Sequence, residues 1–532
     1  EGLKAKSTIY WLLSFSILYF LGMLLPLMEN DSAQFAVMAS RMVIENDYTH
    51  LYKGSLPYLD KPHLHYWLAA ISMKLFGIHA FSYRLPGVLL LFVGAYFVFK
   101  TTKLLYDERT AHFSSLVFIA SQTIILAGFD LRADAVLTGF VAWAIYHLAR
   151  YIYDEQLNQL LWGALIAGFA FATKGLISII VIGGVVLALL NAKQKWDLLF
   201  RVSTLGALLV FLLSLTPVLY AYYIQFDLHP ELVVRGVSNR SGIKFLFWEQ
   251  SFERLSGEGH GKTGNDPFFF FHTFLWAFMP FSLVGIVGLY KTFRSKSSEV
   301  FVLRSLTVAL ALLLGLMSLA QFKLPHYLNV LLPLIALVFT PAVLRLFDQK
   351  IGKSLSVITF TIYGIASVLI CIPFYDYVAP GVFLVLILLS RLLHRRSVSV
   401  ASWLLSGVLA FNLLAFTVFY PKLLEYQSDI SFSKRLNLQE VELVNATNKH
   451  TWNLDFFFQT HLPERSIDEL VDSHETYVLV DIDAYQRLKS LRPDAIEYAS
   501  APHYRVTKLS LKFLSPKTRS SSLEIRRVIW LP

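Results

Sequence analysis

Long apolar runs constrain this sequence more than any other feature. Many of them reach the roughly 20 residues that an α-helix needs to cross about 30 Å of hydrocarbon. Of the 532 residues, 55% are hydrophobic and only 16% are charged, and mean hydropathy is +0.53. A backbone in lipid has to satisfy its own hydrogen bonds, so these runs are expected to be helices. The composition therefore excludes an ordinary soluble enzyme and a disordered chain, and predicts a polytopic α-helical membrane protein.

We count about thirteen membrane spans in this pattern. They lie near residues 8–28, 83–100, 110–129, 134–150, 159–173, 176–190, 203–224, 268–290, 301–320, 326–344, 354–372, 379–393 and 400–419. The first run follows Lys4 and Lys6 and has no small-residue cleavage site at its end. We therefore expect a retained span rather than a cleaved signal peptide.

The distribution of basic residues predicts the orientation of these spans. With the N-terminus inside, every inner segment carries Lys or Arg, whereas the short outer loops hold only Arg132, Lys174 and Lys323. This positive-inside pattern predicts a cytoplasmic N-terminus, and an odd number of spans then places the C-terminal tail outside. The net charge of +10 reflects this loop bias and attraction to anionic lipid, so we expect no nucleic-acid partner.

Three segments outside the spans have a distinct composition. In the long outer segment 29–82, "QFAVMASRMV" and "HLHYWLAAISMKLF" have the spacing of amphipathic juxtamembrane helices; a second outer loop covers 225–267. In the tail, "ETYVLVDIDAYQRLKSL" predicts a strand and then a helix, and "HYRVTKLSLKFL" alternates like a strand. We divide the chain into a transmembrane domain, 1–420, and a small soluble α/β domain, 421–532. Cys371 is the only cysteine, so no internal disulfide and no cysteine-based metal site are expected.

Most of the unusual polar residues gather at the predicted outer boundary of the membrane. They are Asp31, Asp60, Lys61, Asp130, Arg132, Asp134, Lys174, Arg254, Lys323 and His326. Ionisable residues at membrane depth are candidates for function. Several cations and carboxylates beside long apolar helices suit a lipid that carries a phosphate or pyrophosphate and a polar headgroup. We therefore expect any chemistry to take place at headgroup depth on this side.

Each candidate also has a structural interpretation. Lys61 lies just before a helix start, where it either binds a phosphate or extends to the membrane interface. Asp134 either caps a helix or faces Lys61 or Arg132 across a cleft. Lys174 precedes a glycine between two apolar helices, and a role in ending the first helix is favoured there.

Two further segments hold candidates. Arg254 precedes a Gly-rich polar loop that we expect to be mobile. It binds a phosphate, pairs with Gln250 one helical turn away, or contacts a lipid headgroup. Tyr327 stands at the mouth of a span, where it either joins the aromatic belt or donates its hydroxyl to a phosphate.

The ordered set of motifs resembles the polyprenyl-phosphate-dependent glycosyltransferases of the GT-C superfamily, in particular the bacterial lipid A aminoarabinose transferases and the protein O-mannosyltransferase-like enzymes. "ENDSAQFAVMASRM" is similar to the acidic first-loop motif of that family, with Asp31 at the expected carboxylate. "LDKPHLHYW" is similar to its acid-Lys-Pro-x-x-x-Tyr-Trp motif, with Asp60 where Glu is frequent. "SYRLPG", "DAVLTGF", "TKG", "FWEQSFERLSG" and "KLPHY" also match, in order, from about residue 28 to 337.

The resemblance implies transfer of a sugar from a polyprenyl (undecaprenyl) monophosphate donor to a lipid A-like glycolipid, a glycan or a protein acceptor, with inversion at the anomeric carbon. Asp31 and Asp134 are then the catalytic candidates, Asp31 to orient or deprotonate the acceptor hydroxyl. Lys61, Arg254 and Tyr327 would bind the donor phosphate. The expected supporting residues are Asp60, Arg84, Lys174, Lys323 and His326. The resemblance also implies a bacterial plasma (inner) membrane and a periplasmic C-terminal domain.

One departure from the family bears on cofactors. Where the central loop of the family often carries a His near a metal or phosphate site, this chain has Gln250 and Ser251. We therefore expect no required cofactor; a divalent metal could take part but is not implied.

Three other functions stay open. An oligosaccharide or O-antigen ligase would use a pyrophosphate carrier. A lipid-linked sugar transporter predicts internal repeats and polar residues spread through the spans, which the sequence does not show. A scaffold of an envelope complex would tolerate the loss of Asp31 and Lys61.

Overall fold

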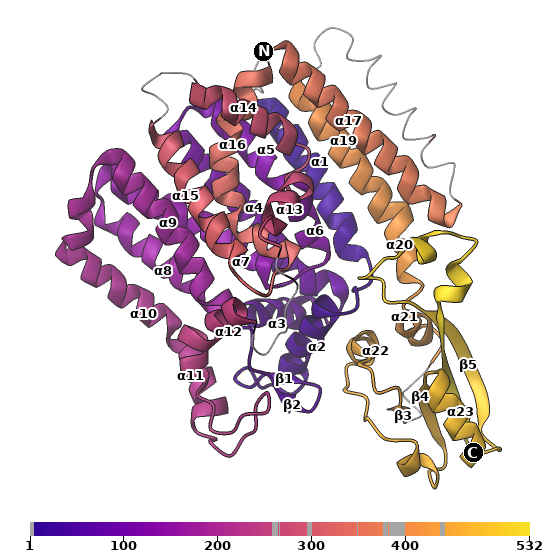
Figure 1. The fold of residues 1–532 in the computed structure, drawn as a ribbon. Coiled ribbons are helices and arrows are strands. Elements are labelled where there is room, and N and C mark those ends of the chain that lie inside the picture. Colours follow the sequence, from indigo (N-terminus) through magenta and orange to yellow (C-terminus); the bar gives the residue numbers. More distant parts are fainter. Residues whose placement is uncertain are drawn as a thin grey trace.

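The structure, a computed structural model, describes residues 5–257, 264, 266–294, 301–347, 349–375, 381, 400–436 and 442–532. Within these ranges the chain forms a bundle of long helices with a small sheet domain at one end (Figure 1). Nine of the described helices are long and apolar enough to cross a membrane, or up to eleven if each of two bent pairs is one span. The expectation of a multi-span helical membrane protein is confirmed.

The nine spanning helices follow the predicted order. They are α1 (Ala5–Leu24), α4 (Ala80–Leu105), α7 (Ala133–Asp154), α9 (Leu176–Lys193), α10 (Val202–Tyr222) with η2 (Tyr223–Asp227), α15 (Phe301–Ser318), η5 (Pro325–Leu331) with α16 (Leu332–Phe347), α17 (Lys350–Cys371) with η6 (Ile372–Phe374), and α19 (Val400–Leu414) with η7 (Ala415–Phe419) and α20 (Tyr420–Leu424).

Two predicted spans are broken in the structure. Near 110–129, α5 (Glu108–Ile119) and α6 (Gln122–Phe129) meet at 50°. Near 268–290, α13 (Phe269–Ala277) and α14 (Ser282–Arg294) are bent by 112°, so a single straight span is wrong there. Pro280 lies in this break and has no N–H with which to continue a helix. The main chain at the two breaks is joined by a 3.0 Å hydrogen bond from Gln122 N to Met279 O.

Two more predicted spans account for the remaining difference between the predicted spans and those found in the structure. The helix near 159–173 forms as α8 (Leu157–Lys174), but it is not among the nine because Asn158, Gln159 and Lys174 lower its hydropathy. The predicted span 379–393 lies outside the described residues except for residue 381, and so does most of the Gly-rich loop after Arg254.

A layer of short elements covers the end of the bundle opposite the start of α1 (Figure 1). It contains α2 (Asp31–Ile44), the hairpin β1 (Tyr52–Lys53) and β2 (Leu56–Pro57), α3 (Leu64–Phe76), α11 (Gly242–Lys244), η3 (Phe245–Glu249) and α12 (Gln250–Ser256). Both predicted amphipathic helices are therefore present, as α2 and α3. They pack against each other, with Phe35 edge-on to Tyr66 at 5.5 Å between ring centroids.

The loop between α2 and α3 is fixed to the end of α10. The carboxamide of Gln225 in η2 accepts a hydrogen bond from Leu51 N at 3.0 Å and donates one to Leu51 O at 2.7 Å. Trp67 of α3 donates to Tyr48 O at 2.6 Å. Because these main-chain groups have partners, the loop holds a defined course up to Asp60 and Lys61.

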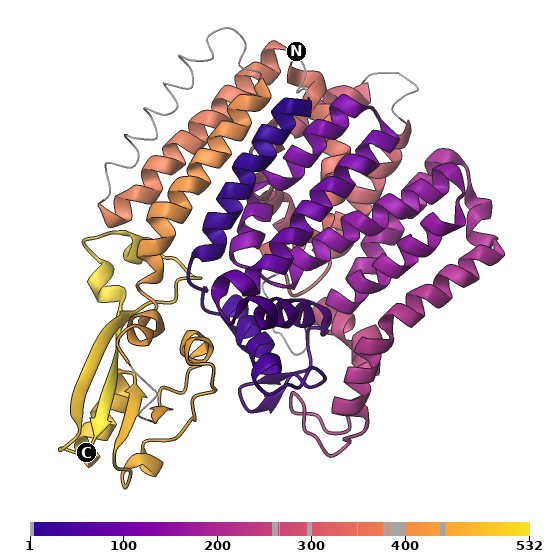
Figure 2. The same cartoon turned by 180° about the vertical axis from the view of Figure 1, so that it is seen from behind.

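The C-terminal sheet domain lies beside the lower end of α1 in both views (Figures 1 and 2). Its four strands have the order β3 (Leu443–Asn445), β4 (Thr476–Val480), β6 (Glu524–Leu531) and β5 (Ile496–His503). β3 and β4 are parallel, and the other pairs are antiparallel. The predicted strand-then-helix is confirmed as β4 and α23 (Ile482–Leu491), where Asp481 caps the helix through a 3.0 Å bond from Ala484 N.

The prediction of a second strand in the tail is wrong. Only His503, the first residue of "HYRVTKLSLKFL", belongs to a strand, and the segment continues as a loop and the short helix α24 (Leu511–Leu514). Tyr504 closes this loop by donating its hydroxyl hydrogen to Lys508 O at 2.8 Å. Ser510 then caps α24, accepting from Phe513 N at 3.2 Å. Local side-chain bonds of this kind compete with a sheet.

Candidate active site

Asp60 holds two cations beside each other at the end of the bundle. Its two carboxylate oxygens lie 2.8 Å from Lys61 Nζ and 2.8 Å from Arg254 Nη2. Arg254 therefore pairs with Asp60 rather than with Gln250, the partner that one alternative predicted. The Gln250 carboxamide instead donates to the carbonyl oxygen of Asp60. Burial, together with the charge of Arg254, lowers the pKa of Lys61 to about 8.

Asp134 and Lys174 form a second, deeper ion pair. Their side chains are only 5% and 4% exposed, and Lys174 Nζ donates to Asp134 Oδ1. His326 Nε2 lies 3.8 Å from the other oxygen, Oδ2. Asp134 is in the first turn of α7 but its side chain caps no main-chain N–H, so its partners are Lys174 and His326. Of the interpretations left open, the structure favours the cleft-facing carboxylate, although across from Lys174.

The break between α8 and α9 brings Lys174 to this position. Gly175 has a φ of +75°, and a Cβ there would be 2.5 Å from Oε1 of Gln250. Only glycine adopts this backbone conformation readily while leaving room for the neighbouring chain. The turn predicted from "TKG" is therefore present, and it delivers the Lys174 ammonium to the inside of the bundle.

Tyr327 connects the two ion pairs. Lys174 Nζ lies 4.5 Å from the centroid of the Tyr327 ring, and Arg254 Cζ lies 5.8 Å from it. Both distances fall within the range of cation–π attraction. The ring thus keeps two cations on the same side of the site without neutralising them.

Asp31 is the most open carboxylate of the group, with 43% of its side chain exposed. It begins α2 and lies 3.3 Å from Arg132, which also bonds Asp130 at 2.8 Å and the His326 ring at 3.0 Å. Arg132 therefore links Asp31 to the Asp134 cluster through His326.

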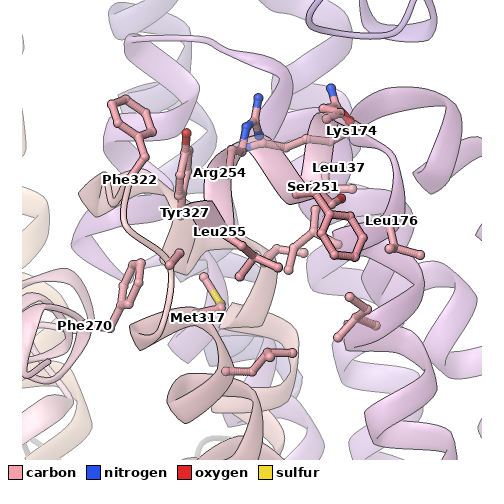
Figure 3. A pocket seen from close by; sticks show the side chains of 17 residues that line it. Leu137, Lys174, Leu176, Ser251, Arg254, Leu255, Phe270, Met317, Phe322 and Tyr327 are labelled. Atoms are coloured by element: carbon pink, nitrogen blue, oxygen red, sulfur yellow. The ribbon is translucent and has the colours of Figure 1, made fainter. Parts of the chain in front are cut away.

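An apolar cavity of about 290 Å³ ends at the cations. Its walls are mostly leucine, isoleucine, phenylalanine and methionine side chains from α7, α9, α12, α13 and α15, and η5 adds Tyr327 and Val330. Figure 3 shows the polar ends of Lys174, Arg254 and Tyr327 turned to the same end, with Phe270 and Met317 at the other. The cavity offers cations to an anionic group and an apolar wall to whatever is attached to it.

A second cavity, of about 640 Å³, is lined mostly by polar and charged residues, and we call it the polar cavity. Its lining includes Asn30, Asp31, Asp130, Arg132, Asp134, His326 and, from the C-terminal domain, Arg505, Thr507 and Lys508. Lys174 lines the apolar cavity and Asp134 lines the polar one, so this ion pair stands between the two.

Two predicted supporting residues have other surroundings. Arg84 is fully buried and donates to the carbonyl oxygens of Met23, Leu25, Pro26 and Phe129, which fixes the end of α1 against the end of α6. Lys323 donates to Asp266 O at 2.8 Å and lines neither of the two cavities. The structure brings the remaining eight candidates together.

Sequence reasoning missed the contribution of the tail. Arg505 and Lys508 reach the polar cavity from a loop more than 80 residues beyond the last predicted span, and no motif marks them. Arg132 and Asp130 belong to the predicted boundary residues, but the sequence alone does not predict them as site residues.

The fold and the site define a multi-span helical membrane protein in which carboxylates and cations collect between two cavities at one end of the bundle. A family model described as dolichyl-phosphate-mannose-protein mannosyltransferase matches residues 60–221. The crystal structure of ArnT from Cupriavidus metallidurans bound to undecaprenyl phosphate superposes with a TM-score of 0.74, covering 98% of this chain and 97% of that one at 17% identity.

Curated relatives are similar over part of their length. An uncharacterized protein of Aquifex aeolicus is 26% identical over 348 residues, which is 64% of this chain and 64% of that protein. An undecaprenyl phosphate-alpha-4-amino-4-deoxy-L-arabinose arabinosyl transferase of Pseudomonas fluorescens is 23% identical over 344 residues, 62% of this chain and 57% of that protein. The chain thus spans less than two thirds of the length of these relatives. The resemblance to GT-C polyprenyl-phosphate glycosyltransferases that the motifs indicated is confirmed.

Proposed function

We propose that the protein is an integral membrane glycosyltransferase that moves a sugar from an undecaprenyl monophosphate carrier to an envelope acceptor, in the first place a lipid A-type glycolipid. The observation that carries this proposal is the Asp134–Lys174 pair between an apolar cavity with cations and a polar cavity with an open carboxylate. Two substrates, one with a long apolar chain, can meet at such a boundary.

The apolar cavity is assigned to the donor. Its walls suit the first isoprene units of the carrier, and its polar end presents Arg254, Lys174 and the Tyr327 hydroxyl to the phosphate. Lys61, joined to Arg254 through Asp60, adds a further positive charge. Hydrogen bonds and charges that strengthen as the phosphate becomes a leaving group lower the barrier without any strong acid.

The polar cavity is assigned to the acceptor. The acceptor oxygen forms a bond to the anomeric carbon while the bond from that carbon to the phosphate oxygen breaks, and the acceptor proton passes to the Asp31 carboxylate. The carrier leaves as polyprenyl phosphate with the electron pair of the broken bond, and the anomeric configuration inverts. Asp134 positions the cations and the acceptor. Arg505 and Lys508 at the rim favour an acceptor that carries phosphate or carboxylate groups.

The site is assigned to the outer face of a bacterial inner membrane. The start of α1 and the C-terminal domain lie at opposite ends of the bundle (Figure 1). The bias of basic residues supports a cytoplasmic start of α1, and the site and the C-terminal domain would then face the periplasm.

The test is transfer of radiolabel from polyprenyl-monophosphate sugars to extracted envelope lipids and proteins. Wild type is compared with Asp31→Asn and Lys61→Ala, and Glu108→Gln serves as control because Glu108 is exposed on α5 and lines neither of these cavities. We expect both site variants to lose about 100-fold or more in rate, and the control to keep full rate. Transfer only from a pyrophosphate carrier would favour the ligase, and full activity of both site variants would refute the assignment.

A further inference from the structure

A separate cluster of ionisable side chains lies where the C-terminal domain meets the membrane-spanning part. Glu29 comes from the segment before α2, Asp429 from α21 (Ser428–Ser433) and His503 from the end of β5. One potential ligand atom from each residue lies within 4.8 Å of the others, and His503 Nε2 is 3.7 Å from Glu29 Oε2. None of the three lines the apolar or the polar cavity.

Two oxygens of this cluster are buried without a hydrogen-bond partner. Among the described residues, Glu29 Oε1 and Asp429 Oδ2 accept no hydrogen bond, although Asp429 is fully buried. Arg526 Nη1 reaches only the other Asp429 oxygen, at 3.4 Å. An unpaired oxygen of a buried carboxylate is costly, so such an atom in a folded protein calls for an occupant.

We propose that Glu29, Asp429 and His503 bind a divalent transition-metal cation, with Zn²⁺ as the best fit. Two carboxylate oxygens and one imidazole nitrogen are ligands that Zn²⁺ accepts in three-ligand protein sites, with water completing the coordination. Ser428 Oγ lies 3.1 Å from His503 Nδ1 and can accept the hydrogen of that nitrogen, which directs Nε2 to the metal. The remaining Asp429 oxygen keeps its contact with Arg526.

The cation holds the C-terminal domain on the segment that leads into α2. The same junction is clamped by Gln427, which accepts from Glu29 N at 2.6 Å and donates to Leu27 O at 3.0 Å. Glu29 is two residues from Asp31, and His503 is two residues from Arg505. The metal is therefore structural, and it fixes the distance between two sides of the polar cavity rather than taking part in bond breaking.

The test uses the full chain purified in detergent, stripped with a chelator and then titrated with ZnCl₂. We expect about one Zn²⁺ per chain by elemental analysis, together with a higher unfolding temperature that Mg²⁺ does not reproduce. His503→Gln, Asp429→Asn and Glu29→Gln should each weaken binding by about tenfold or more. His474→Gln is the matched control, because His474 is exposed in the same domain and its side chain contacts Pro532 O, away from the proposed site.

The measurements distinguish a loss of metal binding from misfolding and from a loss of the proposed transferase activity. Binding is measured on the monodisperse fraction only, and Glu29→Gln, at the less buried side of the site, serves if the Asp429 variant does not fold. A wild-type chain that binds no Zn²⁺ and whose unfolding temperature responds to pH alone would mean that the carboxylates share a proton, and the proposal would be wrong. Equal Zn²⁺ binding by all three ligand variants would overturn it as well. Neither result depends on whether sugar transfer is observed.

Discussion

Replacing Lys174 by Met should destabilise the protein through Asp134, which then keeps a buried carboxylate without its main counter-ion. Removing one partner of a buried ion pair costs about 3–5 kcal/mol. His326 at 3.8 Å can compensate for part of this loss, so we expect a value near the lower end of that range. The cation–π contact of Lys174 with Tyr327 at 4.5 Å disappears as well.

A double-mutant cycle measures the interaction directly. We expect Asp134→Asn with Lys174→Met to be more stable than the sum of the single changes predicts, with a coupling free energy of about 3 kcal/mol. Stability is measured by SDS-induced unfolding in mixed micelles, followed by tryptophan fluorescence. The exposed pair of Lys103 and Glu108, 3.0 Å apart, gives the matched control cycle, and there we expect about 0–1 kcal/mol.

The same variants separate stability from function. The double variant should recover stability and remain inactive, because it lacks both the cation at the donor cavity and the carboxylate at the acceptor cavity. A coupling free energy near zero for Asp134 and Lys174 would refute the reasoning, because it would mean that the two charges do not depend on each other.

Three more predictions concern single positions. Because the pKa of Lys61 is lowered to about 8, its charged form prevails below that pH, and affinity for undecaprenyl phosphate should fall by up to about tenfold per pH unit above it. Lys61→Arg should flatten this pH profile in a binding titration. An unchanged profile in the variant would contradict the assignment of Lys61 to the phosphate. Gly175→Ala should lower the unfolding temperature because of its positive φ and the nearby Gln250 oxygen, whereas Gly183→Ala in α9, with nothing within 4 Å of the added Cβ, should not; equal effects would argue against the turn geometry. Arg84→Lys should lower stability by about 1–3 kcal/mol yet leave kcat per folded molecule unchanged, since the Arg84 side chain donates to main-chain carbonyls and, among the described residues, to no side chain. A selective loss of kcat would give Arg84 a role in the site.

Much of the architecture follows from periodic hydrophobicity, which is a local property of the sequence. The helices around Asp31 and Lys61 and the turn before Gly175 were predictable because each rests on spacing or on one glycine. The sharp bend between α13 and α14 was not predictable, because an apolar sequence has the same pattern in a straight helix and in a bent one.

The partners within the site could not be predicted in the same way. Lys174 and Asp134 are 40 positions apart, and their approach depends on how α7 and α8 pack. The local sequence around Lys174 favours a role in ending its helix. The loop at Arg505 illustrates the same limit: alternating side chains suggested a strand, whereas hydroxyl groups of Tyr504 and Ser510 close a turn.

The position of Asp60 between Lys61 and Arg254 has a consequence for the timing of catalysis. Under the proposed function, the phosphate of the donor is a diester with one negative charge, and it gains a second charge only as the sugar leaves. Asp60 holds both cations at 2.8 Å, so it competes with the phosphate for them throughout. That competition weakens binding of the singly charged donor and of ordinary membrane phosphodiesters, and is overcome as the leaving group forms. Asp60 still competes with the phosphate of the released carrier for the same cations, so product inhibition should be weaker than at a site without this carboxylate.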